Sequence, residues 1–304
     1  MARLSILLAL LLTLTAAAHA ACRVDARATV PLAWVNGHIL VTVAVNDTDA
    51  TFILDTGAER TLMGEDVVHQ LALQRDTWVA STVRGVGGIE QRPNALPRSL
   101  RLGAVTLRRK TLTGDTSVTV GPLPMSIVDG HQIAGLLGRD FLSPFDLDID
   151  LPTHTLTLYD VSGCAGRFLP WSASYAAVPA TMPMGSAIVL QVAVDGRLLR
   201  ALLDTGASAT LIAAPGMYRL GVTPDMLARD PGGSASGVGP AQIPMRLHRF
   251  ASLRVGSEVA HDPKLWVAPV HIVPIVDMLL GADWLHSRRV WLSFGTKQIF
   301  VIQQ

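Results

Sequence analysis

The chain has 304 residues, of which 49% are hydrophobic and 16% charged, and its formal net charge is +1. Acids and bases are interspersed and no basic run occurs, so the charge pattern does not favour a nucleic-acid partner or an anionic membrane surface. A chain of this length accommodates two domains of ordinary size.

The first 20 residues have the pattern of a secretory signal peptide. Arg3 gives a basic start, residues 4–14 are apolar, and small residues lead to Ala20. This apolar run is shorter than a membrane-spanning helix, and no later run reaches the necessary length. We expect a mature chain that starts near Ala21, crosses the inner membrane, remains in the periplasm and has no stable membrane span. An uncleaved N-terminal anchor is the alternative.

Cys22 and Cys164 are the two cysteines of the chain. Two cysteines in an exported chain most simply form one disulfide, which would join the mature N-terminus to the middle of the chain. Two separate thiols are the alternative. Lipid attachment at Cys22 is not expected, because the preceding residues, His19 to Ala21, lack a Leu three positions ahead of it.

The chain contains one long pattern twice. ALLDTGASATL at Ala201–Leu211 matches FILDTGAERTL at Phe52–Leu62, so that Asp204 follows Asp55 by 149 positions. The match continues in Gly-rich segments and in apolar blocks: RGVGG at Arg84–Gly88 with SGVGP at Ser236–Pro240, and LLGRDFL at Leu136–Leu142 with LLGADWL at Leu279–Leu285. A repeat of this length is a domain in its own right. We predict a signal peptide (1–20), an N-terminal lobe (21–160), a linker (161–183), which is alternatively a covering loop, and a C-terminal lobe (184–304).

Strand patterns dominate both lobes. Residues 39–45 (ILVTVAV) alternate between small or polar and branched apolar side chains, and the turn residues Asn46-Asp47 and Asp195-Gly196 follow equivalent strands. Helices are expected only over four short segments: Gly64–Leu73, Gly138–Leu142, Pro224–Arg229 and Gly281–His286. The pattern predicts a mostly β fold of two homologous lobes related by a pseudo-two-fold axis.

An Asp-Thr-Gly-Ala sequence follows an apolar strand in each lobe. The Asp supplies a carboxylate, the Thr hydroxyl can tie the loop to a neighbour, and Gly allows close backbone approach. A single copy would most simply be a turn capped by its Asp. Two copies in lobes related by a pseudo-two-fold would instead bring Asp55 and Asp204 face to face.

Two such carboxylates would share one proton, because placing two negative charges close together is unfavourable. One could take a proton from a water molecule between them while the other donates to a substrate carbonyl, as in the dyad of aspartic proteases. The sequence has no Gly-x-Ser-x-Gly motif, no phosphate-binding loop and no His or Cys cluster typical of metal sites. Neither a cofactor nor a metal is therefore expected.

Over residues 36–160 and 184–304 the sequence resembles retropepsin-like aspartic proteases, fused into one chain. The resemblance rests on Asp-Thr-Gly-Ala, on the apolar Gly-Arg-Asp block and on the Gly-rich segment between them. It implies a catalytic pair, Asp55 and Asp204, and a set of supporting loop residues: Thr56, Gly57, Ala58, Thr205, Gly206 and Ala207. It also implies two flap tips that bind substrate: Gly85, Gly87 and Gly88 in the first lobe, Gly237 and Gly239 in the second.

Glu59 and Arg139 correspond to Ser208 and Ala282 in the second copy. Because the acid and the base are present together or absent together, we expect them to form an ion pair within the first lobe. An acid at the matching place contacts substrate backbone in retroviral proteases, so the resemblance makes Glu59 a further candidate for substrate binding. A surface salt bridge of little energetic weight is the alternative.

The expected function is that of an aspartic endopeptidase acting on a peptide or unfolded protein, which would lie as a strand under the flaps. The active site would be complete in one chain, so a monomer is expected, with no nucleic-acid partner. Because a fold does not fix a function, two alternatives remain: a module that binds peptides without cutting them, and a structural protein that uses the fold as a scaffold.

Overall fold

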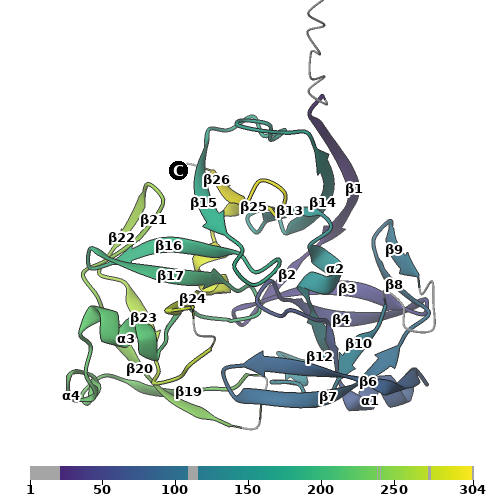
Figure 1. Ribbon diagram of the computed structural model, residues 1–304, viewed down its shortest axis with the longest axis horizontal. Coiled ribbons are helices and arrows are strands. Elements are labelled where there is room, and N and C mark those ends of the chain that lie inside the picture. The colour runs from purple at the N-terminus through teal and green to yellow at the C-terminus, as the bar shows by residue number, and fades with distance from the viewer. Residues whose placement is uncertain (1–20, 109–115, 238, 240, 273–274, 303–304) are drawn as a thin grey trace, which may run out of the picture.

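The computed structural model describes residues 21–108, 116–237, 239, 241–272 and 275–302. The predicted signal peptide lies outside these residues. The structure is mostly β, with 52% strand and 9% helix, and Figure 1 shows two lobes side by side beneath a shared sheet. The predicted fold class of two retropepsin-like β lobes is confirmed. No helix in the described part of the chain has the length and apolar character needed to cross a membrane.

The N-terminal lobe is built on a hairpin that ends at the first Asp-Thr-Gly. Its elements are β2 (Ala33–Val35), β3 (His38–Val45), β4 (Thr48–Leu54), β5 (Leu62–Met63), α1 (Glu65–Gln70), β6 (Gln74–Gly85), β7 (Gly88–Leu96), β8 (Ser99–Leu102), β9 (Val105–Arg108), β10 (Val118–Val120), β11 (Ile127–Val128), β12 (His131–Leu137) and α2 (Arg139–Leu142). Strand β4 lies between β3 and β12 and ends in three buried residues, Phe52, Ile53 and Leu54. A buried central strand therefore delivers Asp55 to the middle of the molecule.

The C-terminal lobe repeats this arrangement. Its elements are β16 (Val189–Val194), β17 (Arg197–Leu203), β18 (Leu211–Ile212), α3 (Ala214–Leu220), α4 (Pro224–Leu227), β19 (Gly232–Ala235), β20 (Ile243–Arg249), β21 (Ser252–Val255), β22 (Glu258–His261), β23 (Lys264–Val267), β24 (Met278–Leu280) and α5 (Ala282–Leu285). The registers agree between lobes, since Leu40 pairs with Ile53 where Val189 pairs with Leu202. Asp204 is therefore delivered in the same way as Asp55.

Among the residues that the structure describes, four of the five helices lie within the segments expected to be helical, and α3 was not predicted. Pro215 and Gly216 at its start look like helix breakers in the sequence. Proline is tolerated in the first turn of a helix, where its missing N–H has no partner to lose. A Cβ on Gly216 would lie 2.4 Å from the carbonyl oxygen of Asp277. This glycine therefore allows α3 to pack closely against the segment before β24.

A sheet built from both lobes joins them above the hairpins. Its strands lie in the order β1 (Arg23–Pro31), β14 (Thr155–Ser162), β13 (Asp146–Asp150), β25 (Arg289–Ser293), β26 (Gln298–Ile302) and β15 (Tyr175–Thr181). Strands β13 and β25 come from different lobes and pair Leu147 with Leu292. The buried carboxylate of Asp148 accepts hydrogen bonds from Arg289 across this junction, with Nη2 to Oδ2 at 2.6 Å. Backbone pairing and a partly buried ion pair thus hold the lobes together.

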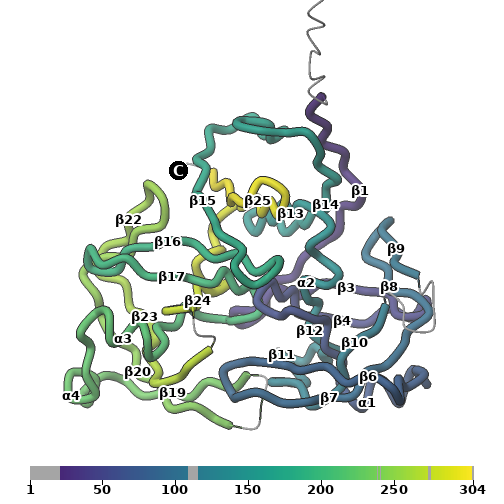
Figure 2. Tube along the Cα trace, viewed as in Figure 1, coloured from purple at the N-terminus to yellow at the C-terminus, as the bar shows by residue number. Residues whose placement is uncertain are grey.

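The segment predicted as a linker, residues 161–183, includes the end of β14 and the whole of β15. Between these strands the chain arches over the shared sheet (Figure 2). Trp171 packs edge-on against Trp291, with ring centroids 6.1 Å apart, and its Nε1 donates to Asp148 Oδ2 at 3.0 Å. The segment therefore covers the aromatic face of the sheet as well as connecting the lobes.

The predicted disulfide between Cys22 and Cys164 is confirmed, and it closes a loop with a sequence separation of 142. It joins neighbouring strand ends, since Arg23 of β1 pairs with Ser162 of β14. The bond therefore fastens the N-terminus beside the start of the covering segment.

A Cys22→Ser/Cys164→Ser variant is expected to unfold with a free energy about 2–4 kcal/mol lower than the native chain, because a long loop is no longer closed in the unfolded state. Urea unfolding of both proteins measures this difference. Treating the native chain with a thiol reductant should produce the same loss. Equal midpoints for the oxidised, reduced and substituted proteins would contradict the prediction.

Candidate active site

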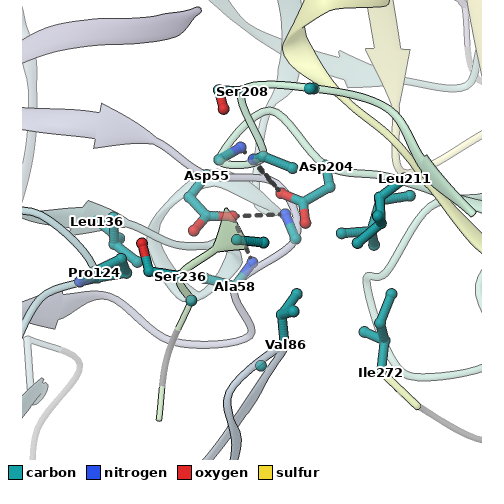
Figure 3. A pocket seen from close by; sticks show the side chains of 18 of the residues that line it. Asp55, Ala58, Val86, Pro124, Leu136, Asp204, Ser208, Leu211, Ser236 and Ile272 are labelled. Atoms are coloured by element: carbon teal, nitrogen blue, oxygen red, sulfur yellow. Dashed lines mark hydrogen bonds between the residues drawn. The ribbon is translucent and has the colours of Figure 1, made fainter. Parts of the chain in front are cut away.

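The loops that follow β4 and β17 meet at the centre of the molecule (Figure 3). The backbone N–H groups of Asp55 and Asp204 donate to Leu137 and Leu280 at 3.0 Å, which fixes each loop to its own lobe. A Cβ on Gly57 would lie 2.4 Å from Asp204 Cγ, and one on Gly206 would lie 2.4 Å from Asp55 Cγ. Each carboxylate thus rests against the glycine of the opposite loop, and the structure brings the two predicted aspartates together.

Backbone N–H groups solvate both carboxylates in place of water. Oδ1 of each aspartate accepts two hydrogen bonds of 2.8–3.1 Å, from Gly57 and Ala58 at Asp55 and from Gly206 and Ala207 at Asp204. Hydrogen bonds to the charged form favour ionisation and offset part of the unfavourable burial. Four of the six loop residues predicted to support the site therefore donate to the carboxylates directly: Gly57, Ala58, Gly206 and Ala207.

The surroundings of the two carboxylates raise the pKa of both. Burial, together with the negative charge of Asp204, raises the pKa of Asp55 to about 8. Burial also raises the pKa of Asp204, but the N–H bonds from Ala207 and Gly206 and the positive charge of Arg139 oppose that rise. Two carboxylates this close, each with a raised pKa, favour a state in which they share one proton.

Thr56 and Thr205 lock the two loops to each other. The Thr56 hydroxyl donates to Leu203 O at 2.8 Å and accepts from the N–H of Thr205 at 3.1 Å. The Thr205 hydroxyl donates to Leu54 O at 2.6 Å and accepts from the N–H of Thr56 at 2.9 Å. All four bonds are buried and cross between the lobes. They fix the separation of the carboxylates.

A Thr205→Val variant keeps the shape of the side chain and removes its hydroxyl. It leaves Leu54 O and the N–H of Thr56 without partners, so we expect the free energy of unfolding to fall by about 2–4 kcal/mol. A Thr205→Ser variant keeps the hydroxyl and is expected to lose less than about 1 kcal/mol. Urea unfolding compares the two, and equal losses would contradict this role for the hydroxyl.

A cavity of about 360 Å³ opens in front of both aspartates. Ile53, Met125 and Leu136 line it from the first lobe. A larger apolar set lines it from the second lobe: Leu202, Leu211, Met245, Trp266, Ile272 and Leu279. Figure 3 shows Leu136 and Leu211 on opposite sides of the dyad. The cavity therefore has an apolar wall on each side of the acid pair.

Two hairpins close the cavity from the side opposite the aspartates. In the first, β6 and β7 pair up to Gly85 and Gly88 and turn through Val86 and Gly87; in the second, β19 and β20 form the stem. The tips touch, since a Cβ on Gly239 would lie 2.4 Å from the carbonyl carbon of Gly87.

Only some of the predicted substrate-binding residues line the cavity. Gly85 and Gly237 line the cavity, whereas Glu59 and three further glycines of the tips are not among its lining residues: Gly87, Gly88 and Gly239. Their role in binding substrate remains a prediction.

The prediction that Glu59 and Arg139 form an ion pair is wrong. Arg139 is 5% exposed and donates instead to oxygens on both lobes: to Ala58 O at 3.3 Å, Met184 O at 3.4 Å and Ser186 Oγ at 3.5 Å. Burial lowers the pKa of Arg139, and Glu59 is the first of the negative charges that oppose this effect. Glu59 thus acts on Arg139 by its field, while its exposed carboxylate makes no ion-pair contact with it.

Sequence reasoning missed His38 and Val86, and with them most of the second-lobe wall. Wall residues such as Met245 and Trp266 belong to strands β20 and β23, where apolar side chains look like ordinary core. A signal for His38 was present in the sequence. The register that aligns the two copies makes His38 the equivalent of Ala187 in the second lobe. A polar residue in one copy and an apolar residue at the equivalent position of the other mark a difference between otherwise matching lobes.

Comparisons with known proteins agree with this architecture. An aspartic proteinase from Irpex lacteus matches the fold with a TM-score of 0.51 at 14% identity, over 91% of this chain and 97% of that one. DNA damage-inducible protein 1 of Yarrowia lipolytica (strain CLIB 122 / E 150) is 26% identical over 124 residues, which are 40% of this chain and 27% of that protein. The family model described as aspartyl protease matches residues 41–141 and 190–284, more than half of the chain. The predicted resemblance to retropepsin-like proteases is confirmed, and the chain belongs to the aspartyl protease family.

Proposed function

We propose that the protein is an aspartic endopeptidase, which hydrolyses peptide bonds with a water molecule activated between Asp55 and Asp204. The observation that carries this proposal is the pair of facing carboxylates from Asp55 and Asp204, which line one largely apolar cavity and whose pKa values are both raised. Perturbed acids in a concave apolar site are typical of catalytic groups.

The chemistry follows from the protonation state of the pair. The ionised carboxylate accepts a proton from the water while the water oxygen attacks the carbonyl carbon of the substrate. The protonated carboxyl donates its proton to the carbonyl oxygen, so a neutral tetrahedral diol forms. When the C–N bond breaks, the protonated carboxyl gives its proton to the amine nitrogen. One hydroxyl proton of the diol passes to the ionised carboxylate. The pair then again holds one proton, and no covalent enzyme adduct forms.

The cavity suits an extended peptide. Val86 lines it from the flap side, and the apolar walls of both lobes flank the acids. Closure of the flap tips over a bound segment would exclude bulk water from the reaction. A peptide or an unfolded protein is therefore the proposed substrate.

The proposed location is the periplasm, reached by secretion across the inner membrane. The disulfide supports a compartment that is oxidising, because such bonds persist there. The cavity receives both acids from one chain, which supports action as a monomer.

The test is to incubate the purified mature chain with a reduced, unfolded protein between pH 3 and pH 8 and to identify new termini by mass spectrometry. Cleavage in the native chain that disappears in Asp204→Asn supports the proposal. Cleavage in H₂¹⁸O should place one heavy oxygen in each new carboxyl group. Retained peptide binding without any cleavage would favour the non-cutting peptide-binding module instead.

A further inference from the structure

The two walls of the cavity differ in one polar group. His38 begins β3 and lines the cavity on the side of the first lobe. The other polar side chains around the cavity, apart from the aspartates and the indole of Trp266, are half-buried or exposed: Arg84, Ser208, Ser234 and Ser236. His38 is 6% exposed. It is therefore the buried neutral hydrogen-bonding group of the first-lobe wall.

One ring nitrogen of His38, Nδ1, is buried and has no hydrogen-bond partner among the residues that the structure describes. Burial lowers the pKa of His38, so the ring is neutral and offers one N–H donor and one acceptor nitrogen. An unpaired buried polar group is unfavourable by an amount comparable to a lost hydrogen bond. Because His38 lines the cavity, a turn of its ring toward a bound substrate would give Nδ1 the missing partner.

The equivalent place in the second lobe is apolar. Matching registers in the two hairpins put Ala187 where the first lobe has His38. Ala187 is fully buried in an apolar cluster that continues into the cavity wall through Leu202, Leu211 and Leu279. Two nearly equivalent lobes would otherwise let a peptide bind in either direction. A single polar group on one side removes that equivalence.

We propose that His38 determines substrate specificity: its imidazole hydrogen-bonds a hydroxyl or amide side chain of the peptide on the first-lobe side, while the second-lobe wall accepts a large apolar side chain. This inference rests on the proposed peptidase function. A hydroxyl or a primary amide both donates and accepts, which matches a neutral imidazole.

The test uses peptides of one sequence in which Thr replaces Val, or Asn replaces Leu, at each position flanking the cleaved bond. These pairs are similar in shape and differ in hydrogen bonding. We expect the native chain to prefer Thr or Asn at one position by at least about tenfold in kcat/KM, because the apolar peptide leaves His38 unpaired. His38→Leu should abolish that preference, and His38→Gln should retain it.

A matched control is Met125→Leu, which alters the same wall without changing its polar groups. It is expected to keep the preference for Thr over Val, whatever its effect on rate. Thermal unfolding of each variant confirms that it is folded. Equal rates for the paired peptides at every position in the native chain would overturn the inference, as would a preference that survives in His38→Leu.

Binding separates this inference from the proposed function. The same peptides, labelled with a fluorophore, are titrated into Asp55→Asn, and into Asp55→Asn/His38→Leu, with fluorescence anisotropy as the signal. Tenfold tighter binding of the Thr or Asn peptide that disappears in the double variant supports the role of His38 even where no cleavage occurs. Absence of cleavage by the native chain would count against the peptidase function alone.

Discussion

An Asp55→Asn variant is expected to cleave peptides at least about 10³-fold more slowly than the native chain, because an amide cannot exchange the proton on which the proposed reaction depends. Oδ1 of Asp55 accepts two backbone N–H bonds, which an amide oxygen can also accept. The loop geometry should therefore survive, and the loss should appear in kcat. Asp204→Asn is expected to behave in the same way, since its carboxylate accepts an equivalent pair of bonds.

The same substitution should stabilise the protein at neutral pH. Burial raises the pKa of Asp55 to about 8 from an ordinary value of 3.8, so the folded state binds this proton more tightly than the unfolded state does. The resulting stability is complete below pH 3.8 and is lost as the pH rises through about 8. A neutral amide does not titrate, so Asp55→Asn avoids this loss. At pH 8 we expect a gain of about 1–3 kcal/mol in the free energy of unfolding.

Two measurements check these expectations. Peptide cleavage at the pH of maximal activity gives kcat, and urea unfolding at pH 4 and pH 8 gives the change in stability. The stability advantage of Asp55→Asn should be large at pH 8 and small at pH 4. Full activity in either single variant would exclude the shared-proton mechanism. An advantage at pH 4 that equals the one at pH 8 would mean that the acid pair does not titrate as a unit.

The sequence was sufficient to predict the features that the two copies share. Repetition of Asp-Thr-Gly predicted the two-lobed β fold, and repeated apolar strands placed Asp55 and Asp204 at equivalent strand ends. These features depend on periodicity and on register, which are local properties of each copy. A pseudo-two-fold relation then brings equivalent points together without any further information.

Features that depend on where side chains point could not be predicted in this way. Arg139 was assigned to Glu59 because the two residues covary between the copies, yet its donors reach Ala58 O and cross to Met184 O in the other lobe. A buried guanidinium can be satisfied by carbonyl oxygens as well as by a carboxylate, and composition does not distinguish these partners. For the chain segment before β15 the sequence left a linker and a covering loop open, because the aromatic contacts with Trp291 that decide between them join residues far apart in the sequence.

The close approach of Gly57 to the carboxylate of Asp204 predicts a second large effect, in the Gly57→Ala variant. The added Cβ would lie 2.4 Å from Asp204 Cγ and 2.5 Å from Oδ1, so the loop or the carboxylate must move. Displacing a reacting group by about 1 Å is enough to reduce kcat by about 10²-fold. Overpacking should also lower the free energy of unfolding by about 1–3 kcal/mol.

Gly295→Ala provides the matched control, because a Cβ at this turn position between β25 and β26 has no heavy atom within 4 Å. It should leave kcat within about twofold of the native value and stability within about 0.5 kcal/mol. Gly206→Ala should repeat the Gly57→Ala result, since its Cβ would lie 2.4 Å from Asp55 Cγ. Native activity in both catalytic-loop variants would show that the loops can stand further apart without loss. The close approach of the carboxylates would then not be required for the reaction, and the shared proton would lose its geometric basis.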